Sequence, residues 1–247
     1  MLTEQRYDII LKLLEEKNSI TVAEVKELLN TSESTVRRDI TALHNAGKLV
    51  KVFGGAVAVD RTVMTHEPTV EQKAMVNVEA KQLVAARAAA LIEPEDFVYL
   101  DAGTTTASML SFLTEKSAAF VTNAVAHART LAAAGFRVYL VGGELKGSTE
   151  AVVGNQALMN LQSYHFTKGF FGTNGISRQS GLTTPDMNEA MVKKTAMGQC
   201  RECFILADHS KFGNVSSVTF GTFQSGTILT DSCPEEYKSS GNVVICG

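Results

Sequence analysis

The sequence predicts a chain of two domains: three short helices followed by a β-hairpin, and then a larger α/β domain built on a mostly parallel sheet. Helical apolar spacing and a glycine pair in the first 60 residues predict the small domain. Short β-branched or aromatic runs that alternate with helical segments predict the larger one. The length of 247 residues also exceeds that of a usual single domain.

The first two helices follow from apolar spacing and a capping signal. Tyr7, Ile10, Leu11 and Leu14 fall at the i, i+3, i+4, i+7 spacing of one buried helix face. Thr21 followed by Glu24 forms a capping box, which predicts the start of a second, shorter helix. Its buried face is predicted to consist of Val22, Val25, Leu28 and Leu29.

A third helix is predicted after a tight turn. Ser32 can cap it, and Gly47 is placed to close it in a left-handed conformation. Val36, Ile40 and Leu43 point inward at helical spacing. The residues that remain outside are Ser34, Thr35, Arg37, Arg38 and Thr41, types that hydrogen-bond phosphates and base edges.

A basic hairpin follows the third helix. Residues 48–53 and 56–59 read as two strands joined through Gly54 and Gly55, a pair suited to a two-residue turn. Residues 34–53 carry four basic side chains and one acidic side chain, Asp39, whereas residues 1–33 carry four basic and seven acidic side chains. We interpret the third helix and the hairpin as a winged helix-turn-helix that binds double-stranded operator DNA, with Lys51 on the flanking backbone. Asp39 is expected to pair with a neighbouring arginine, and a merely solvated helix face is the alternative.

The composition and charge of the chain limit the kinds of partner that it can bind. The net charge of −3 excludes binding of nucleic acid by bulk electrostatics, so we expect a localised patch and a homo-dimer or homo-tetramer. No apolar run of about 18 residues occurs and the start lacks a signal-peptide core, which predicts a cytoplasmic protein without a membrane partner. Cys200 and Cys203 have no second pair beside them, so we expect a structural role, no metal and no cofactor.

The second domain is predicted to be Rossmann-like. A helical pattern extends from Val70 through Val76 and Leu83 to Pro94, and strands are predicted at 97–100, 118–121, 138–141, 168–171 and 203–206. Ligands of such sheets bind at the carboxyl ends of the strands. Polar residues follow each of these runs, which predicts a pocket for a phosphorylated polyol.

The first of these polar segments is residues 101–106. Asp101 is followed by Gly103, which allows close backbone approach, and by Thr104, Thr105 and Thr106, whose hydroxyls and helix-start amides suit an anion. A threonine-capped helix without a ligand is the alternative. Further polar residues at strand ends are Thr122, Asn123, Gly142, Gly143, Lys146, Asn174 and Lys211.

The whole chain resembles the DeoR family of bacterial transcription regulators. The resemblance is carried by residues 34–39, 54–56, 101–106, 122–123, 142–146, 154, 172–176, 193 and 207–212. It implies a C-terminal domain that resembles ribose-5-phosphate isomerase and binds a sugar-phosphate effector that controls DNA affinity. It adds Lys193 to Lys146 and Lys211 as candidates for phosphate or hydroxyl contacts. The domains expected are 1–57 for DNA binding, 58–76 as a linker, and 77–247 for sensing and oligomerisation.

The isomerase resemblance also predicts that the protein is not an enzyme. It places Asn174 at an active-site aspartate and Val192 at the general base, and neither side chain can take a proton. Glu189 and Asp186 lie nearby and could substitute, so an active isomerase is one alternative. A constitutive DNA-binding protein whose C-terminal half only assembles is the other.

Two segments suggest the effector. Residues 181–186 with Glu189 and Ala190, and residues 146–151, are similar to regulators of fructose utilisation, whose effector is fructose 1-phosphate. Regulators of tagatose, galactitol and lactose phosphotransferase systems share much of the pattern. We therefore expect a repressor of a sugar-utilisation operon, with fructose 1-phosphate as the first candidate.

Overall fold

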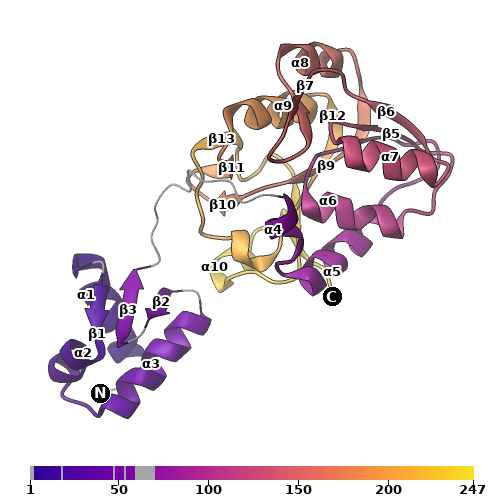
Figure 1. Cartoon of the computed structure of the whole chain (residues 1–247). Coiled ribbons are helices and arrows are strands. Elements are labelled where there is room, and N and C mark those ends of the chain that lie inside the picture. The colour runs from indigo at the N-terminus through magenta and orange to yellow at the C-terminus, as the bar shows by residue number, and fades with distance from the viewer. Residues whose placement is uncertain (1–2, 18, 47, 53, 59–69) are drawn as a thin grey trace. The chain divides into compact units, whose positions relative to one another are not determined.

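The computed structural model describes residues 3–17, 19–46, 48–52, 54–58 and 70–247. The chain divides into two compact units, Met1–Thr62 and Val63–Gly247. Both predicted kinds of domain are present (Figure 1). The described part of the predicted linker, residues 70–76, belongs to the second unit and contains a helix, α4 (Val70–Ala74).

The first unit is a three-helix domain with a small antiparallel sheet. Its elements are α1 (Thr3–Lys17), β1 (Ser19–Thr21), α2 (Val22–Leu29), α3 (Glu33–Asn45), β2 (Leu49–Val52) and β3 (Gly55–Ala58). The sheet order is β1-β3-β2, so the predicted hairpin gains a third strand that the sequence did not indicate. Residues Phe53 and Val59, at the predicted strand ends, and Gly47 lie outside the described residues.

The predicted caps are present. Glu24 N–H donates to Thr21 Oγ1 at 3.2 Å while Thr21 N–H donates to Glu24 Oε2 at 2.8 Å, and Thr35 N–H donates to Ser32 Oγ at 3.2 Å. The expected core forms around Ile10, Leu14, Val25, Val36, Ile40 and Leu43. Leu28 was expected in it but is 53% exposed, because α2 turns this position away from α1 and α3.

The hairpin depends on two adjacent glycines for different reasons. Gly54 has φ +82°, a left-handed conformation that side chains rarely adopt. A Cβ at Gly55 would overlap the backbone carbonyl oxygen of Ile20 in β1. The second glycine is therefore required by close strand approach rather than by the turn itself.

The second unit is built on a seven-stranded parallel sheet with order β15-β14-β12-β9-β4-β5-β6. The strands are β4 (Phe97–Leu100), β5 (Ala119–Thr122), β6 (Arg137–Leu140), β9 (Phe166–Gly172), β12 (Cys200–Leu206), β14 (Thr227–Thr230) and β15 (Val243–Ile245). The five strands that the sequence predicted are confirmed; β14 and β15 were not predicted.

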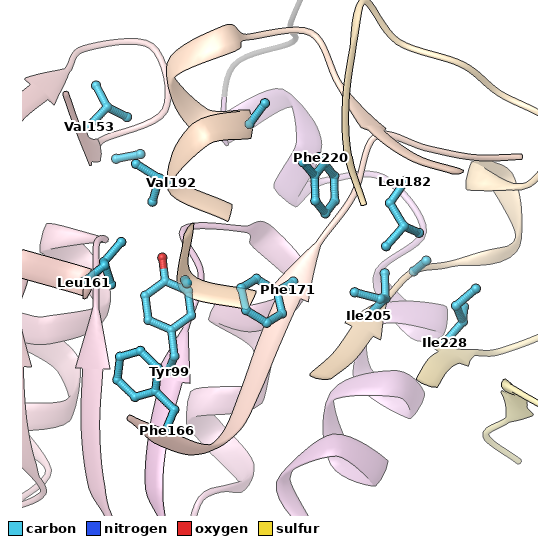
Figure 2. Close-up of a cluster of buried hydrophobic side chains, with 14 of the residues drawn as sticks. Tyr99, Val153, Leu161, Phe166, Phe171, Leu182, Val192, Ile205, Phe220 and Ile228 are labelled. Carbon is cyan, nitrogen blue, oxygen red and sulfur yellow. The ribbon is translucent and has the colours of Figure 1, made fainter. Parts of the chain in front are cut away.

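The sheet separates two apolar cores. Helices α8 (Asn155–Gln162) and α9 (Met187–Gly198) contribute to one core, with Tyr99, Phe171 and Ile205 from the strands (Figure 2). Helices α5 (Val78–Ala89), α6 (Thr104–Met109) and α7 (Val125–Ala133) contribute to the other, with the alternate strand residues Leu100, Phe170 and Leu206. Successive side chains of a strand point to opposite faces, so α9 and α5 cover opposite sides of the sheet.

Smaller elements surround the sheet. They are α4, the hairpin of β7 (Glu144–Lys146) and β8 (Ala151–Val153), the sheet of β10 (Gly175–Ser177), β11 (Gly181–Thr184) and β13 (Val218–Gly221), and α10 (Glu235–Lys238). α5 begins only at Val78, after Asn77 in a left-handed conformation, so the predicted long helix is divided into α4 and α5. No helix in the described ranges is long and apolar enough to cross a membrane.

Candidate functional site

The Thr41 hydroxyl connects the outer surface of α3 to β2 of the hairpin. Lys51 Nζ on β2 donates to Thr41 Oγ1 at 2.9 Å, and that hydroxyl donates to the Arg37 carbonyl oxygen at 2.7 Å. Ser34, Arg37, Arg38 and Lys51 are exposed, and Thr35 and Thr41 are half-buried. The six predicted DNA contacts therefore belong to α3 and to the strand that is linked to it.

The two adjacent arginines differ in their partners. Arg37 forms an exposed ion pair with Glu33 at 2.6 Å, one turn away. Such surface pairs contribute about 0–1 kcal/mol, so a phosphate can replace the carboxylate. Arg38 is exposed and forms no ion pair with any residue that the structure describes. Both guanidinium groups can thus be offered to an anion.

Asp39 has a different partner from the one expected. Its carboxylate is buried and receives two hydrogen bonds from Arg6 of α1, Nε to Oδ2 at 2.7 Å and Nη2 to Oδ1 at 3.0 Å. Asp39 thus pairs with an arginine as expected, but not with its sequence neighbours, because it faces inward, between Val36 and Ile40, whereas Arg37 and Arg38 face outward. The pair connects α1 to α3 and leaves the outer face cationic.

The second unit contains a cavity of about 390 Å³ at the carboxyl ends of β4, β9 and β12. Six of the predicted effector residues line it: Gly103, Thr104, Thr105, Asn174, Lys193 and Lys211. Val70, Gln72 and Lys73 of α4 and the following Val76 also line it. The volume suits a small organic ligand.

Three lysines and one carboxylate of the cavity lining lie close to one another. Lys73, Lys81 and Lys211 line the cavity together with Asp208. Burial lowers the pKa of Lys81; Asp208 opposes this shift, and the nearby charges of Lys211 and Lys73 add to it. The Lys81 ammonium donates to the Lys73 carbonyl oxygen. Positive charge therefore exceeds negative charge at this wall, which favours an anion.

Lys73 and Lys81 were not predicted. Lys81 lies one turn before Val84 and Ala85, on the buried face of α5, and it is only 4% exposed. A lysine on the apolar face of a helix is a signal that the sequence does carry, because lysine is seldom buried without a role.

The cavity floor is a buried ion pair. Lys193 of α9 forms an ion pair with Asp101, and their side chains are 7% and 3% exposed. Lys193 also donates to the Gly172 carbonyl oxygen at 3.1 Å, and Gly172 N–H donates to Asp101 Oδ2 at 3.0 Å. Asp101 itself does not line the cavity; it positions Lys193 and the end of β9.

The threonines after β4 have separate roles. Thr104 and Thr105 line the cavity, whereas Thr106 does not. The Thr106 hydroxyl donates to the Asp101 carbonyl oxygen at 2.6 Å and accepts from Gly103 N–H at 2.9 Å. Thr106 therefore fixes the loop that presents the other two.

Four predicted effector residues lie away from this cavity: Thr122, Asn123, Gly142 and Gly143. Asn123 accepts from the Tyr99 hydroxyl at 3.0 Å and donates to the Val152 carbonyl oxygen at 3.1 Å. Thr122 Oγ1 accepts from Ala124 N–H at 3.1 Å, and Gly142 N–H donates to Asn160 Oδ1 at 3.0 Å. A Cβ at Gly143 would lie 2.6 Å from the Val153 carbonyl oxygen. In the structure these residues hold strands and loops together.

Lys146 also lies outside the cavity lining. Its ammonium lies 2.9 Å from Glu189 Oε1 and 3.2 Å from Asp186 Oδ2. Glu189 lines the cavity with Thr149, whose hydroxyl donates to the same Glu189 oxygen at 2.6 Å. Burial disfavours the charged form of Asp186, but hydrogen bonds from Glu189 N–H and Lys146 outweigh it and lower the pKa of Asp186.

The position that the isomerase resemblance assigns to a general base is apolar. Val192 is 1% exposed and packs in the core beside Val153 and Leu161 (Figure 2). Asn174 lines the cavity and accepts a hydrogen bond from Thr184 at 3.3 Å. Cys200 and Cys203 are free thiols packed against the same core. The described residues contain no group of three or more His, Cys, Asp or Glu side chains that could hold a metal ion.

Comparison with known proteins assigns both units. Residues 6–62 match a DeoR-like helix-turn-helix domain, and residues 76–232 match a DeoR C terminal sensor domain. The chain is 39% identical over 236 residues to the uncharacterized HTH-type transcriptional regulator FruR of Bacillus subtilis, covering 95% of this chain and 93% of that protein. It is 32% identical over 241 residues to the lactose phosphotransferase system repressor of Streptococcus mutans, covering 96% and 95%.

A solved structure is similar to part of the second unit. Ribose 5-phosphate isomerase A from Methanocaldococcus jannaschii has 16% identity and a TM-score of 0.41, covering 55% of each chain. The two domain matches and the full-length relatives are decisive: this chain belongs to the DeoR family of transcription regulators.

Proposed function

We propose that the chain is a sequence-specific repressor of a sugar-utilisation operon, and that a sugar phosphate bound in the cavity controls its affinity for operator DNA. The observation that carries the effector part is the cavity lining, in which four lysines face two carboxylates at the carboxyl ends of a parallel sheet. The name of the Streptococcus mutans relative, a lactose phosphotransferase system repressor, supports the same kind of regulation.

The chemistry of the cavity suits a phosphate and several hydroxyls together. A phosphate monoester carries a charge of about −1.5 to −2 at neutral pH, which complements Lys73, Lys81 and Lys211. The hydroxyls of Thr104 and Thr105 add donors on the same lining. We take fructose 1-phosphate as the first candidate, in line with the similarity to a regulator named FruR.

The route from the cavity to DNA is proposed to start at α4. Val70, Gln72, Lys73 and Val76 line the cavity, and they follow in sequence on the segment that leaves the winged helix. α4 packs against α6, whose first residues also line the cavity. A ligand that binds one position of α4 more tightly than another shifts the equilibrium between them, and about 1–3 kcal/mol of coupling is typical of such regulation.

The DNA-binding part is proposed to act as a homo-dimer or homo-tetramer. Two copies place two α3 helices in successive major-groove half-sites, with Arg37 and Arg38 on phosphates or bases. Association also compensates for a net charge of −3, which gives one copy little non-specific attraction to DNA.

A thermal-shift panel with phosphorylated sugars and their unphosphorylated parents tests the proposal. A ligand at about 100 times its Kd adds about 2.7 kcal/mol of stability, which shifts Tm by several degrees in a domain of this size. We expect stabilisation by one phosphorylated sugar and none by its parent. Thr105→Ala should then require more effector to change operator binding while its DNA affinity without effector stays unchanged.

Two results would reject the proposal. Equal stabilisation by the parent sugars would show that the lysines do not recognise a phosphate. Ketose–aldose interconversion of the phosphosugar by the pure protein would identify an enzyme instead, with Glu189 as a carboxylate that lines the cavity.

A further inference from the structure

The cavity has walls of opposite character that come from opposite faces of the sheet. Lys81 lies in the first turns of α5, which packs in one core, and Glu189 lies in the first turn of α9, which packs in the other. Lys73 and Lys211 are close to Lys81, and Thr149 is bound to Glu189. A ligand in the cavity therefore meets three lysines with Asp208 on one side, and on the α9 side it meets the Glu189 carboxylate and Lys193, whose charge Asp101 neutralises.

The Glu189 carboxylate is held in a defined orientation. Its Oε1 atom accepts from the Thr149 hydroxyl at 2.6 Å and from the Lys146 ammonium at 2.9 Å. Its backbone N–H donates to Asp186 Oδ1 at 2.9 Å, which fixes the start of α9. Two of these contacts come from the β7–β8 hairpin and the third from the N-cap of α9, so the side chain is placed before any ligand arrives.

The second carboxylate oxygen remains for a ligand. Oε2 of Glu189 accepts no hydrogen bond from the residues that the structure describes, and the side chain lines the cavity. An ionised carboxylate only accepts hydrogen bonds. Its partner in the cavity must therefore donate, as a hydroxyl does, and it must not be a second phosphate, which would be repelled.

We propose that Glu189 determines the specificity of the sensor cavity: Oε2 accepts a hydrogen bond from a sugar hydroxyl at the end opposite the phosphate, and its charge excludes a phosphate there. The inference rests on the proposed function and adds the class of ligand. The chain then senses a sugar monophosphate that presents a free hydroxyl at its far end, and it discriminates against the corresponding bisphosphate.

The test compares three probes on the full-length protein by isothermal titration calorimetry: fructose 1-phosphate, fructose 1,6-bisphosphate and inorganic phosphate. We expect the wild type to prefer the monophosphate to the bisphosphate by at least about tenfold. Glu189→Gln should bind the monophosphate about tenfold more weakly, because a charged hydrogen bond becomes a neutral one. The same variant should lose most of the discrimination against the bisphosphate and should bind inorganic phosphate as the wild type does.

Two further variants separate charge from structure. Asp186→Asn is the matched control, because Asp186 also pairs with Lys146 but does not line the cavity; it should keep the wild-type preference. Thr149→Val removes the hydroxyl that orients Oε1 and keeps the charge. This variant should bind the monophosphate more weakly and should still discriminate against the bisphosphate.

The outcomes distinguish this inference from the proposed function. Unchanged discrimination in a folded Glu189→Gln variant would overturn the inference alone. A parallel loss of affinity for inorganic phosphate would also overturn it, since Glu189 would then only support the fold. Absence of binding of all three probes to the wild type would overturn the proposed function and, with it, this inference.

Discussion

Replacement of Asp101 by Asn is expected to destabilise the second unit and, at the same time, to strengthen its binding of phosphate. The substitution keeps the shape of the side chain and removes the negative charge that neutralises Lys193. Lys193 retains the Gly172 carbonyl oxygen as an acceptor at 3.1 Å. The ammonium is thus left on the cavity floor without a counter-charge.

The size of both effects follows from burial. Removing one partner of a buried ion pair costs about 3–5 kcal/mol, and we expect about 3 kcal/mol because Lys193 borders a cavity that admits water. That corresponds to a fall in Tm of about 6–12 °C for a domain of this size. A unit charge removed within several ångströms of a bound anion is worth about 1–3 kcal/mol at an effective dielectric constant of about 20. Inorganic phosphate should therefore bind the variant at least about fivefold more tightly.

The assay is thermal unfolding of the wild type and Asp101→Asn across a series of phosphate concentrations, with sodium chloride holding the ionic strength constant. Asp96→Asn is the control. Asp96 forms a buried ion pair with Lys168 at 2.8 Å just before β4, at the opposite end of that strand from Asp101. It should lower Tm without changing the response to phosphate.

Two results would refute this reasoning. A variant within about 0.5 kcal/mol of the wild type would mean that Asp101 and Lys193 do not depend on each other for stability. A phosphate response equal to that of Asp96→Asn would mean that the cavity floor does not face the anion.

Three further predictions concern other parts of the chain. Gly55→Ala should unfold the winged helix at a lower denaturant concentration, with a loss above about 2 kcal/mol, because the added methyl group overlaps the Ile20 carbonyl; circular dichroism of the purified variant and of Gly147→Ala, whose Cβ would meet open space without a left-handed backbone, makes the comparison. His127 is buried, and burial lowers its pKa from 6.5 to about 4, so the folded state stays neutral where the unfolded state takes up a proton. Stability is therefore full above pH 6.5 and falls by about 3 kcal/mol as the pH drops to 4, and His127→Gln should flatten this slope in urea titrations. Arg38→Ala should weaken operator binding in fluorescence anisotropy and reduce the slope of log affinity against log salt concentration by about one, while Tm is preserved. An unaltered slope would show that Arg38 does not contact DNA.

Local signals explain what the sequence predicted well. The capping box of Thr21 and Glu24 and the Gly54–Gly55 turn depend on residues that are neighbours in sequence. A short stretch of sequence is therefore enough to predict their geometry. The loop after β4 was also predictable, since a glycine and three threonines follow directly on an apolar run.

Long-range pairing explains what was missed. β14 and β15 are four and three residues long and are separated only by loops and the four-residue α10. The sequence pattern of alternating strands and helices is therefore too weak there to predict them. Lys81 lies 23 residues before Thr104, and the packing of α5 against α6 brings both to one cavity. Lys146 was predicted as an effector contact because its strand-end position is visible, whereas its partner Glu189 follows 43 residues later.

The position of α4 determines how this protein should be dissected. A fragment that starts at residue 77, the boundary suggested by the sequence, would lack Val70, Gln72, Lys73 and Val76, and with them one wall of the cavity. Ligand affinities measured on such a fragment would describe a cavity that lacks part of its lining. Cutting before residue 70 keeps the lining complete, and the difference in affinity between the two fragments reports how much of the binding free energy resides in the segment that leads to the DNA-binding unit.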